Sequence, residues 1–117
     1  MTLRNDDLLI PQGTTWAARW PVYGPDKTLA DLTGWSVRSQ VRLKYQRDTI
    51  LHEWSTTLGN AIASANGYVE VRLEPAESSA WTWLHTTAVY DVELTDPDGN
   101  VIRITQGEIT ISPEITK

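Results

Sequence analysis

Strict alternation of apolar and polar residues marks three segments of the chain, residues 35–44, 68–73 and 88–94. Successive side chains of a β-strand point to opposite faces, so this period of two predicts strands with one buried face and one solvated face. No window has apolar residues at helical spacing over three turns. The pattern therefore predicts a mainly β structure whose apolar strand faces pack together.

Weaker strand patterns occupy residues 8–10, 16–22 and 50–54, with proline and glycine turns between them. Residues 101–112 predict one long strand that bends at Gly107, because a glycine inside a strand is typical of a bulge or bend. The run from Asp96 to Gly99 predicts the hairpin before it, and residues 75–80 predict a single helical turn that begins at a proline.

Seven or eight short strands at roughly 8–12-residue spacing are typical of an all-β fold. We expect a two-sheet β-sandwich that covers residues 1–117 as a single domain. A small barrel is the competing architecture. Alternation allows only one apolar face per strand, so we expect one set of aliphatic side chains to be buried together. These are Val37, Val41, Val69, Val71, Val92 and Leu94.

Two other details of the pattern predict local structure. Asp31 is placed to accept hydrogen bonds from the backbone after it in an Asx-type turn, with Gly34 in the left-handed conformation before the next strand. Tyr90 alternates inward, at a position where sandwich folds often bond a hydroxyl group to backbone. We expect both residues to be structural.

Length and charge narrow the range of functions. The chain has 117 residues, 10 Lys and Arg, 15 Asp and Glu, and a net charge of −5. The chain therefore has no excess of basic residues, which binding to a nucleic-acid backbone normally requires. The first ten residues lack the apolar stretch of a secretory signal, and no segment is long and apolar enough for a membrane span. We therefore expect neither a nucleic acid nor a membrane as partner.

Candidate catalytic and metal-binding patterns are weak. The chain has no cysteine, and its two histidines, His52 and His85, have no third ligand at a metal-motif spacing. We expect His52 to be a core histidine bonded to backbone. Asp96, Asp98 and Asn100 share the first ligand spacings of a calcium loop, but a tight hairpin explains them better. With no nucleophile elbow and no phosphate-binding glycine loop, we expect no enzymatic activity, cofactor or metal.

The six tryptophans are the strongest candidates for a binding role. Trp35 and Trp54 lie in predicted strands, and we expect them in the core. The members of each of two other pairs share one strand face, and we expect that one small core does not hold all four rings. For Trp81 and Trp83, core packing, a protein interface and carbohydrate stacking all stay open. The candidate partner-binding residues are thus Trp16, Trp20, Trp81 and Trp83.

A set of ordered motifs resembles a family of small phage virion proteins. It comprises DLTGWSVR at residues 31–38, QVR at 40–42, YDVEL at 90–94, DGNV at 98–101, GEI at 107–109 and PEIT at 113–116. These runs resemble the immunoglobulin-like N-terminal modules of tailed-phage baseplate upper proteins and related minor tail structural proteins. The likeness extends from about Leu8 to Thr116 and implies an immunoglobulin-like fold. The likeness does not extend to the long fibre or receptor-binding region of those proteins, so we do not carry their host-binding role over to this chain.

The resemblance implies a non-enzymatic virion structural protein that docks on copies of itself and on other tail, baseplate or capsid proteins. Such a protein assembles in the cytoplasm of the host bacterium. The alternative is a carbohydrate-binding β-sandwich that presents exposed tryptophans to a surface glycan. A small enzyme whose site the sequence does not reveal is a third possibility. Gene neighbourhood would separate the first two, by placing the protein among virion genes or among glycan-degrading ones.

Overall fold

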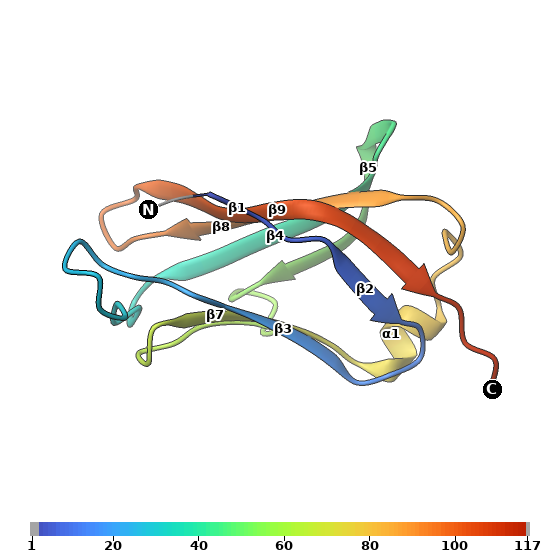
Figure 1. Cartoon of the computed structure of the whole chain (residues 1–117), viewed down its shortest axis with the longest axis horizontal. Coiled ribbons are helices and arrows are strands. Elements are labelled where there is room, and N and C mark those ends of the chain that lie inside the picture. The colour runs from blue at the N-terminus through green and yellow to red at the C-terminus, as the bar shows by residue number, and fades with distance from the viewer. Residues whose placement is uncertain (1–2, 117) are drawn as a thin grey trace.

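Two β-sheets pack face to face and enclose a layer of hydrophobic side chains between them (Figure 1). The structure is a computed structural model, and it describes residues 3–116. Nearly all of its regular structure is strand, so the predicted two-sheet β-sandwich is confirmed. No helix within these residues is long and apolar enough to cross a membrane.

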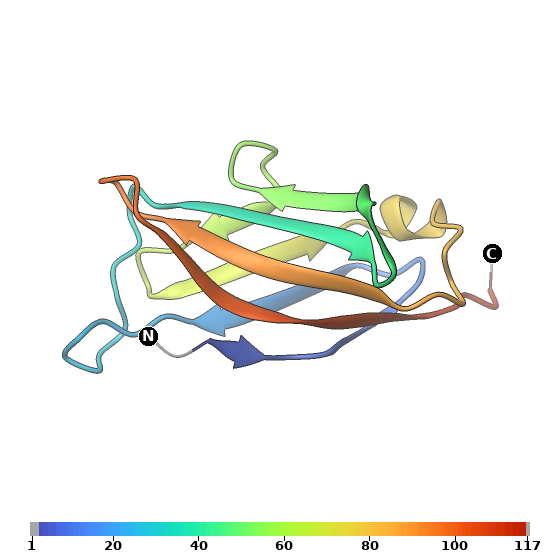
Figure 2. The same ribbon diagram turned by 90° about the horizontal axis from the view of Figure 1, so that it is seen from above.

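The larger sheet has six strands, and its N-terminal strands β1 and β2 both run parallel to the last strand, β9. The other pairings in this sheet, β9 with β8, β8 with β4 and β4 with β5, are antiparallel. The two views in Figures 1 and 2 show β4, β8 and β9 lying side by side along the length of the molecule. The strand bounds are β1 Arg4–Asn5, β2 Leu8–Pro11, β4 Ser36–Leu43, β5 Gln46–Ser55, β8 Ala88–Thr95 and β9 Val101–Ser112.

The smaller sheet consists of β3 (Trp16–Pro21), β7 (Tyr68–Leu73) and β6 (Ala61–Ala63), with β7 in the centre. The helix α1 (Pro75–Ser79) follows β7 and covers one end of the core. Proline suits its first position because the missing N–H would have no partner there. The buried Ser78 in α1 accepts a hydrogen bond from the backbone of Gly13, which fixes the turn after β2.

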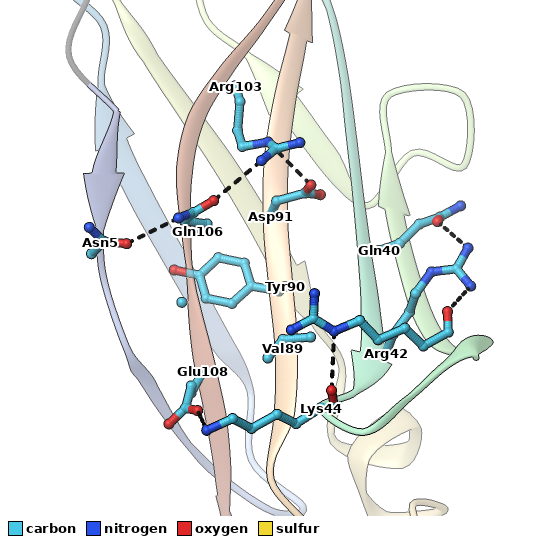
Figure 3. Close-up of a pocket in the computed structure, with 12 residues that line it drawn as sticks. Asn5, Gln40, Arg42, Lys44, Val89, Tyr90, Asp91, Arg103, Gln106 and Glu108 are labelled. Carbon is cyan, nitrogen blue, oxygen red and sulfur yellow. Dashed lines mark hydrogen bonds and ion pairs between the residues drawn. The ribbon is translucent and has the colours of Figure 1, made fainter.

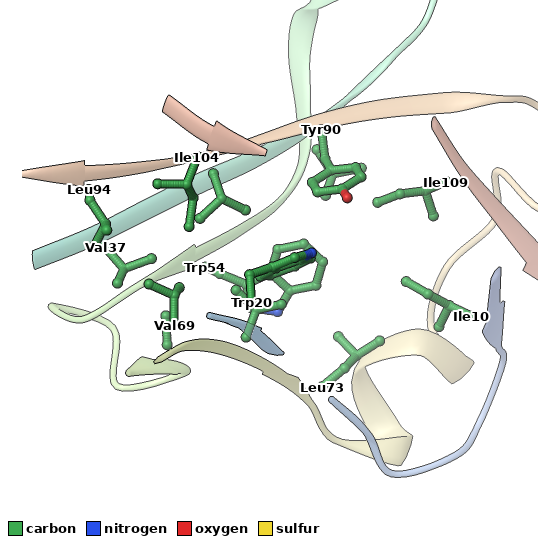
Figure 4. Close-up of a cluster of buried hydrophobic side chains, with 14 of the residues drawn as sticks. Ile10, Trp20, Val37, Trp54, Val69, Leu73, Tyr90, Leu94, Ile104 and Ile109 are labelled. Carbon is green, nitrogen blue, oxygen red and sulfur yellow. The ribbon is translucent and has the colours of Figure 1, made fainter. Parts of the chain in front are cut away.

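The core contains all six aliphatic residues predicted from alternation, each at most 2% exposed. Its largest fully buried side chain is Trp54, whose indole donates a hydrogen bond to the carbonyl oxygen of Arg72. The rings of Trp20 and Tyr90 stack nearby with centroids 6.2 Å apart (Figure 4). Trp35, predicted to be in the core, is half-buried and packs against it.

The bend predicted at Gly107 has a different basis. The register of β8 and β9 shifts where Val92 pairs with Thr105 and Glu93 pairs with Arg103, so the additional residue is Ile104. Gly107 lies on β9, opposite the link between β1 and β2. A Cβ atom on Gly107 would overlap the backbone carbonyl of Asp6 in that link. The glycine is needed because another segment of backbone approaches closely.

The predicted turns have the expected bonds. The carboxylate of Asp31 accepts from the backbone N–H of Thr33 at 3.0 Å, and Gly34 has a φ of 84°. At the hairpin between β8 and β9, the carboxylate of Asp96 accepts from the N–H groups of Asp98 and Asn100, both at 2.9 Å. The hydroxyl of Tyr90 donates to backbone as predicted, and its acceptor is the carbonyl oxygen of Asp6.

Candidate functional site

The outer face of the larger sheet carries an open depression of about 470 Å³, which we call the basin (Figure 3). Strands β1, β4, β5, β8 and β9 and the turn between β4 and β5 contribute to it. The side chains that line it are mostly charged or amide-bearing. They belong to Asn5, Gln40, Arg42, Lys44, Arg47, Asp91, Arg103, Gln106 and Glu108, with Val89, Tyr90 and Gly107 completing the lining.

Strand register explains why these residues meet. On β4, Val41 points into the core, so Gln40 and Arg42 on either side of it point outward. Gln40 is paired with Asp91 of β8, which is in turn paired with Gln106 of β9. Arg42 is paired in the same way with Val89 and then Glu108. Two parallel rows of outward side chains therefore cross three strands.

Both carboxylates of the basin are held by cations. Lys44 Nζ lies 2.5 Å from a carboxylate oxygen of Glu108, and Arg103 Nε lies 3.4 Å from one of Asp91. The hydrogen bond with Glu108 raises the pKa of Lys44 above its ordinary value. Each carboxylate thus has a charged partner in place.

Arg42 and Arg47 are bonded differently, through neutral acceptors. Arg42 Nη1 donates to the carbonyl oxygen of Arg47 at 2.6 Å, and Arg42 Nη2 donates to Gln40 Oε1 at 2.8 Å. Arg47 Nε donates to the carbonyl oxygen of Lys44 at 3.1 Å. Within residues 3–116, neither guanidinium forms an ion pair. These two guanidinium groups are therefore positioned by neutral backbone and amide oxygens.

The four candidate tryptophans are distributed differently from the prediction. Trp16 and Trp20 share one face of β3, as expected, but that face is the core face. Trp20 is only 3% exposed and its indole donates to Asp6 Oδ2 at 2.9 Å. Its assignment as an accessible contact residue is therefore wrong, because the sandwich accommodates this ring beside Tyr90. Trp16 is half-buried, 6.1 Å from the ring of Trp54.

Trp81 and Trp83 lie after α1 and are half-buried against the edge of the core. Their rings are 4.9 Å apart, and the ring of His52 on β5 lies 5.5 Å from that of Trp81. This aromatic cluster leaves part of each indole accessible. Both rings also pack inward, and the pair stays a candidate contact surface.

His52 is half-buried beside Trp54, and burial lowers its pKa. We expected this histidine to bond to backbone, but its Nε2 atom is enclosed without a hydrogen-bond partner among the described residues. The indole nitrogen of Trp83 is enclosed in the same way. In the described part of the chain, no group of three or more His, Asp or Glu side chains gathers as a metal site.

The basin was not predicted from the sequence, although the polar outward face of β4 that forms part of it was. The outward positions of β4 are all polar, two of them, Arg38 and Arg42, are basic, and the basic Lys44 follows directly in the turn. A solvated strand face explains that pattern equally well. Only the pairing of β4 with β8 and of β8 with β9 brings Arg103 and Glu108 to the same depression.

Comparison with known proteins identifies the fold. No family model and no curated protein matches the sequence. Among solved structures, the chain is similar to a chicken TCR, with a TM-score of 0.57 and 13% sequence identity. The alignment covers 97% of this chain and 56% of that chain, so this chain spans little more than half the length of that relative. By its fold, the chain is an immunoglobulin-like β-sandwich.

Proposed function

We propose that the chain is a non-enzymatic, immunoglobulin-like structural module that docks on other proteins in a phage virion and on copies of itself. The observation that carries docking is the basin, a depression of mixed charge on the outer face of the larger sheet. Virion membership is supported by the ordered motifs from Asp31 to Thr116, and assembly would take place in the host cytoplasm. Tail, baseplate and capsid positions are all compatible with it.

Two exposed residues that neighbour lining residues of the basin, Tyr45 beside Lys44 and Ile50 paired with Arg42, supply apolar area for such a contact. Tyr45, in the turn between β4 and β5, is 87% exposed, and Ile50 on β5 is 47% exposed. Exposed tyrosines combine large apolar area with a polar group and are enriched where protein interfaces derive most of their binding energy. The ammonium group of Lys44 lies 5.6 Å from the centre of the Tyr45 ring. Charged and apolar contacts are thus available side by side.

The bonding within the basin favours docking over catalysis. Each carboxylate already pairs with a cation, through the Lys44–Glu108 and Arg103–Asp91 contacts. These contacts engage both carboxylates with side chains of the chain itself, so neither is placed as an unpartnered group facing the depression. Side chains arranged in this way suit the recognition of a complementary surface.

Fractionation of virus particles tests the proposal. Particles from a lysate of the producing bacterium are banded by density, and the protein is expected in the particle band in a fixed ratio to the major virion proteins. Tyr45→Ala should reduce its incorporation without changing the melting temperature. Tyr23→Ala, at another exposed tyrosine (50% exposed), is the matched control and should incorporate normally.

Recovery of the protein only from the soluble fraction would contradict virion membership. Glycan binding that is lost in Trp81→Ala, together with absence from particles, would favour the carbohydrate-binding alternative. The observation behind this alternative is the partly accessible Trp81–Trp83 pair, since indole faces can stack on sugar rings.

A further inference from the structure

We propose that the basin binds an acidic segment of another virion protein, and that Arg42 and Arg47 bind the carboxylates of that segment. This inference rests on the proposed docking function and specifies the chemistry of the partner. Four cations and two carboxylates line the basin, which leaves an excess of two positive charges. The whole chain carries a net charge of −5, so this local excess runs against its overall balance.

The positions of the two arginines suit carboxylate binding. Arg42 is held by the carbonyl oxygen of Arg47 and by Gln40, and Arg47 is held by the carbonyl oxygen of Lys44. A guanidinium group has five N–H donors, so these bonds leave donors available on both side chains. Side chains already held in place lose less conformational entropy when a ligand binds. The geometry is that of two partly fixed, uncompensated cations beside one depression.

The amide side chains of the basin suit a peptide backbone. Asn5, Gln40 and Gln106 lie among the cations, and beside their hydrogen bonds within the chain each keeps an unused N–H donor and an unused oxygen lone pair. Val89 provides a half-buried apolar patch between them, and Tyr45 provides an exposed ring beside Lys44. A segment with spaced carboxylates and at least one apolar residue would find a contact for each of its groups.

A nucleic acid fits the same surface less well. Its phosphates are regularly spaced and dense in charge, and Asp91 and Glu108 lie in the same depression as the cations. The remaining surface of the chain is acidic on balance and would repel a polyanion beyond the basin. An acidic peptide can place its carboxylates next to the arginines and its neutral groups next to the two acids.

Peptide binding tests the inference directly. The probe is a fluorescently labelled peptide of about ten residues, roughly the span of a strand across the sheet, with glutamates at alternate positions around a leucine. A second peptide has glutamine in place of each glutamate. Fluorescence anisotropy should show binding of the glutamate peptide only, weakened strongly between about 50 mM and about 500 mM NaCl, because salt screens exposed charge pairs.

Variants locate the binding site. The double variant Arg42→Gln/Arg47→Gln should weaken binding of the glutamate peptide by about tenfold or more, since both charge-assisted bonds are lost. The charge-matched control is Arg38→Gln/Lys27→Gln, which removes two exposed cations outside the basin. It should bind the peptide with nearly unchanged affinity. Circular dichroism and melting temperature verify that both variants fold.

Several outcomes would overturn the inference. These are equal binding of the two peptides, equal weakening by the two double variants, or binding of a single-stranded oligonucleotide in place of the peptide. Salt-sensitive self-association that requires Arg42 and Arg47, without peptide binding, would assign the basin to a second copy of this chain instead. If the protein still bands with particles in any of these cases, the proposed function stands while this inference fails.

Discussion

Tyr90 joins the N-terminal segment to the core through one hydroxyl group, which donates a hydrogen bond to the carbonyl oxygen of Asp6. Tyr90→Phe keeps the buried ring but removes the donor, so we expect the free energy of unfolding to fall by about 1–3 kcal/mol. Urea denaturation measures this change. Tyr23→Phe, at an exposed ring, is the control and should change the free energy by less than about 0.5 kcal/mol. A similar loss in both variants would contradict the anchoring role.

The same hydroxyl makes stability depend on alkaline pH. Burial raises the pKa of Tyr90 from 10.0 to about 12. Above the pKa of the unfolded state, the native state therefore binds more protons than the unfolded state, and stability falls as pH rises. This contribution is complete below pH 10 and is lost between about pH 10 and about pH 12. The unaltered chain should lose more unfolding free energy across this interval than Tyr90→Phe, and equal losses would contradict the assignment.

Glu70 is a buried carboxylate that connects two arginines on the smaller sheet. Its side chain is 4% exposed, and it pairs with Arg19 of β3 at 2.5 Å and with Arg72 of its own strand. Burial acts to raise the pKa of Glu70, but the hydrogen bonds from the two arginines outweigh it and hold the pKa below its ordinary value. Ionised Glu70 therefore stabilises the fold at pH values above the pKa that its carboxyl group has in the unfolded chain. This contribution is lost as the pH falls through the lower pKa of Glu70 in the folded chain.

Glu70→Gln should accordingly lower the free energy of unfolding at neutral pH by about 1–3 kcal/mol, because both arginines lose a charged partner. The difference between this variant and the unaltered chain should shrink as the pH falls below the ordinary carboxyl range. Denaturant titrations at several pH values measure it, with Asp98→Asn on the exposed hairpin as the control. A difference that does not vary with pH would contradict the ionic role of Glu70.

At the scale of elements, the link between β1 and β2, which both pair in parallel with β9, depends on Gly107. A Cβ atom there would overlap the carbonyl group of Asp6, so Gly107→Ala must displace the N-terminal segment. We expect a loss of about 1–3 kcal/mol in unfolding free energy, as for other overpacked sites, and faster hydrogen exchange in β1 and β2. Gly99→Asn, in open space on the hairpin, should cost less because asparagine tolerates positive φ. Unchanged exchange in β1 and β2 would contradict this explanation.

Strands with strict alternation and clear turns at their ends were predictable from the sequence. The bounds of β7 and β9 agree with the predicted residues 68–73 and 101–112, because apolar residues recur along one face of each strand between clear turns. Strands β1 and β6 were not predicted, since two and three residues are too few to show a period. The first half of β5 was missed because its side chains are exposed and carry no apolar pattern.

The candidate site was less predictable because it depends on strand order. Alternation identified Arg42 and Lys44 as outward residues, but it contains no information about which strand lies beside β4. Ring counting could not say which of the four candidate tryptophans are buried, and the sandwich holds Trp20 against Tyr90 with its nitrogen bonded to Asp6. Both differences arise from contacts between residues far apart in the chain, which local patterns do not encode.

At the scale of the whole molecule, the pairings that define the fold join distant parts of the chain. Arg4 pairs with Thr105 across the sheet, and Ser36 pairs with Thr95. Folding must close these long loops before the contacts form, which makes sandwich proteins slow to fold. We therefore expect refolding in about milliseconds to seconds, measured by stopped-flow tryptophan fluorescence, which reports burial of Trp20 and Trp54. Refolding in microseconds would contradict this dependence on distant pairing.

The order of these events is also testable, because β2 joins the sheet across nearly the full length of the chain. Ile10 on β2 and Val92 on the central strand β8 are both fully buried, so truncating either removes core contacts. If β2 docks after the rate-limiting step, Ile10→Val should mainly accelerate unfolding, whereas Val92→Ala should mainly slow folding. Ile-to-Val changes in a core typically cost about 0.5–1.5 kcal/mol, which is large enough for this comparison at most buried sites. Equal slowing of folding by both variants would place β2 in the folding nucleus and reverse the proposed order.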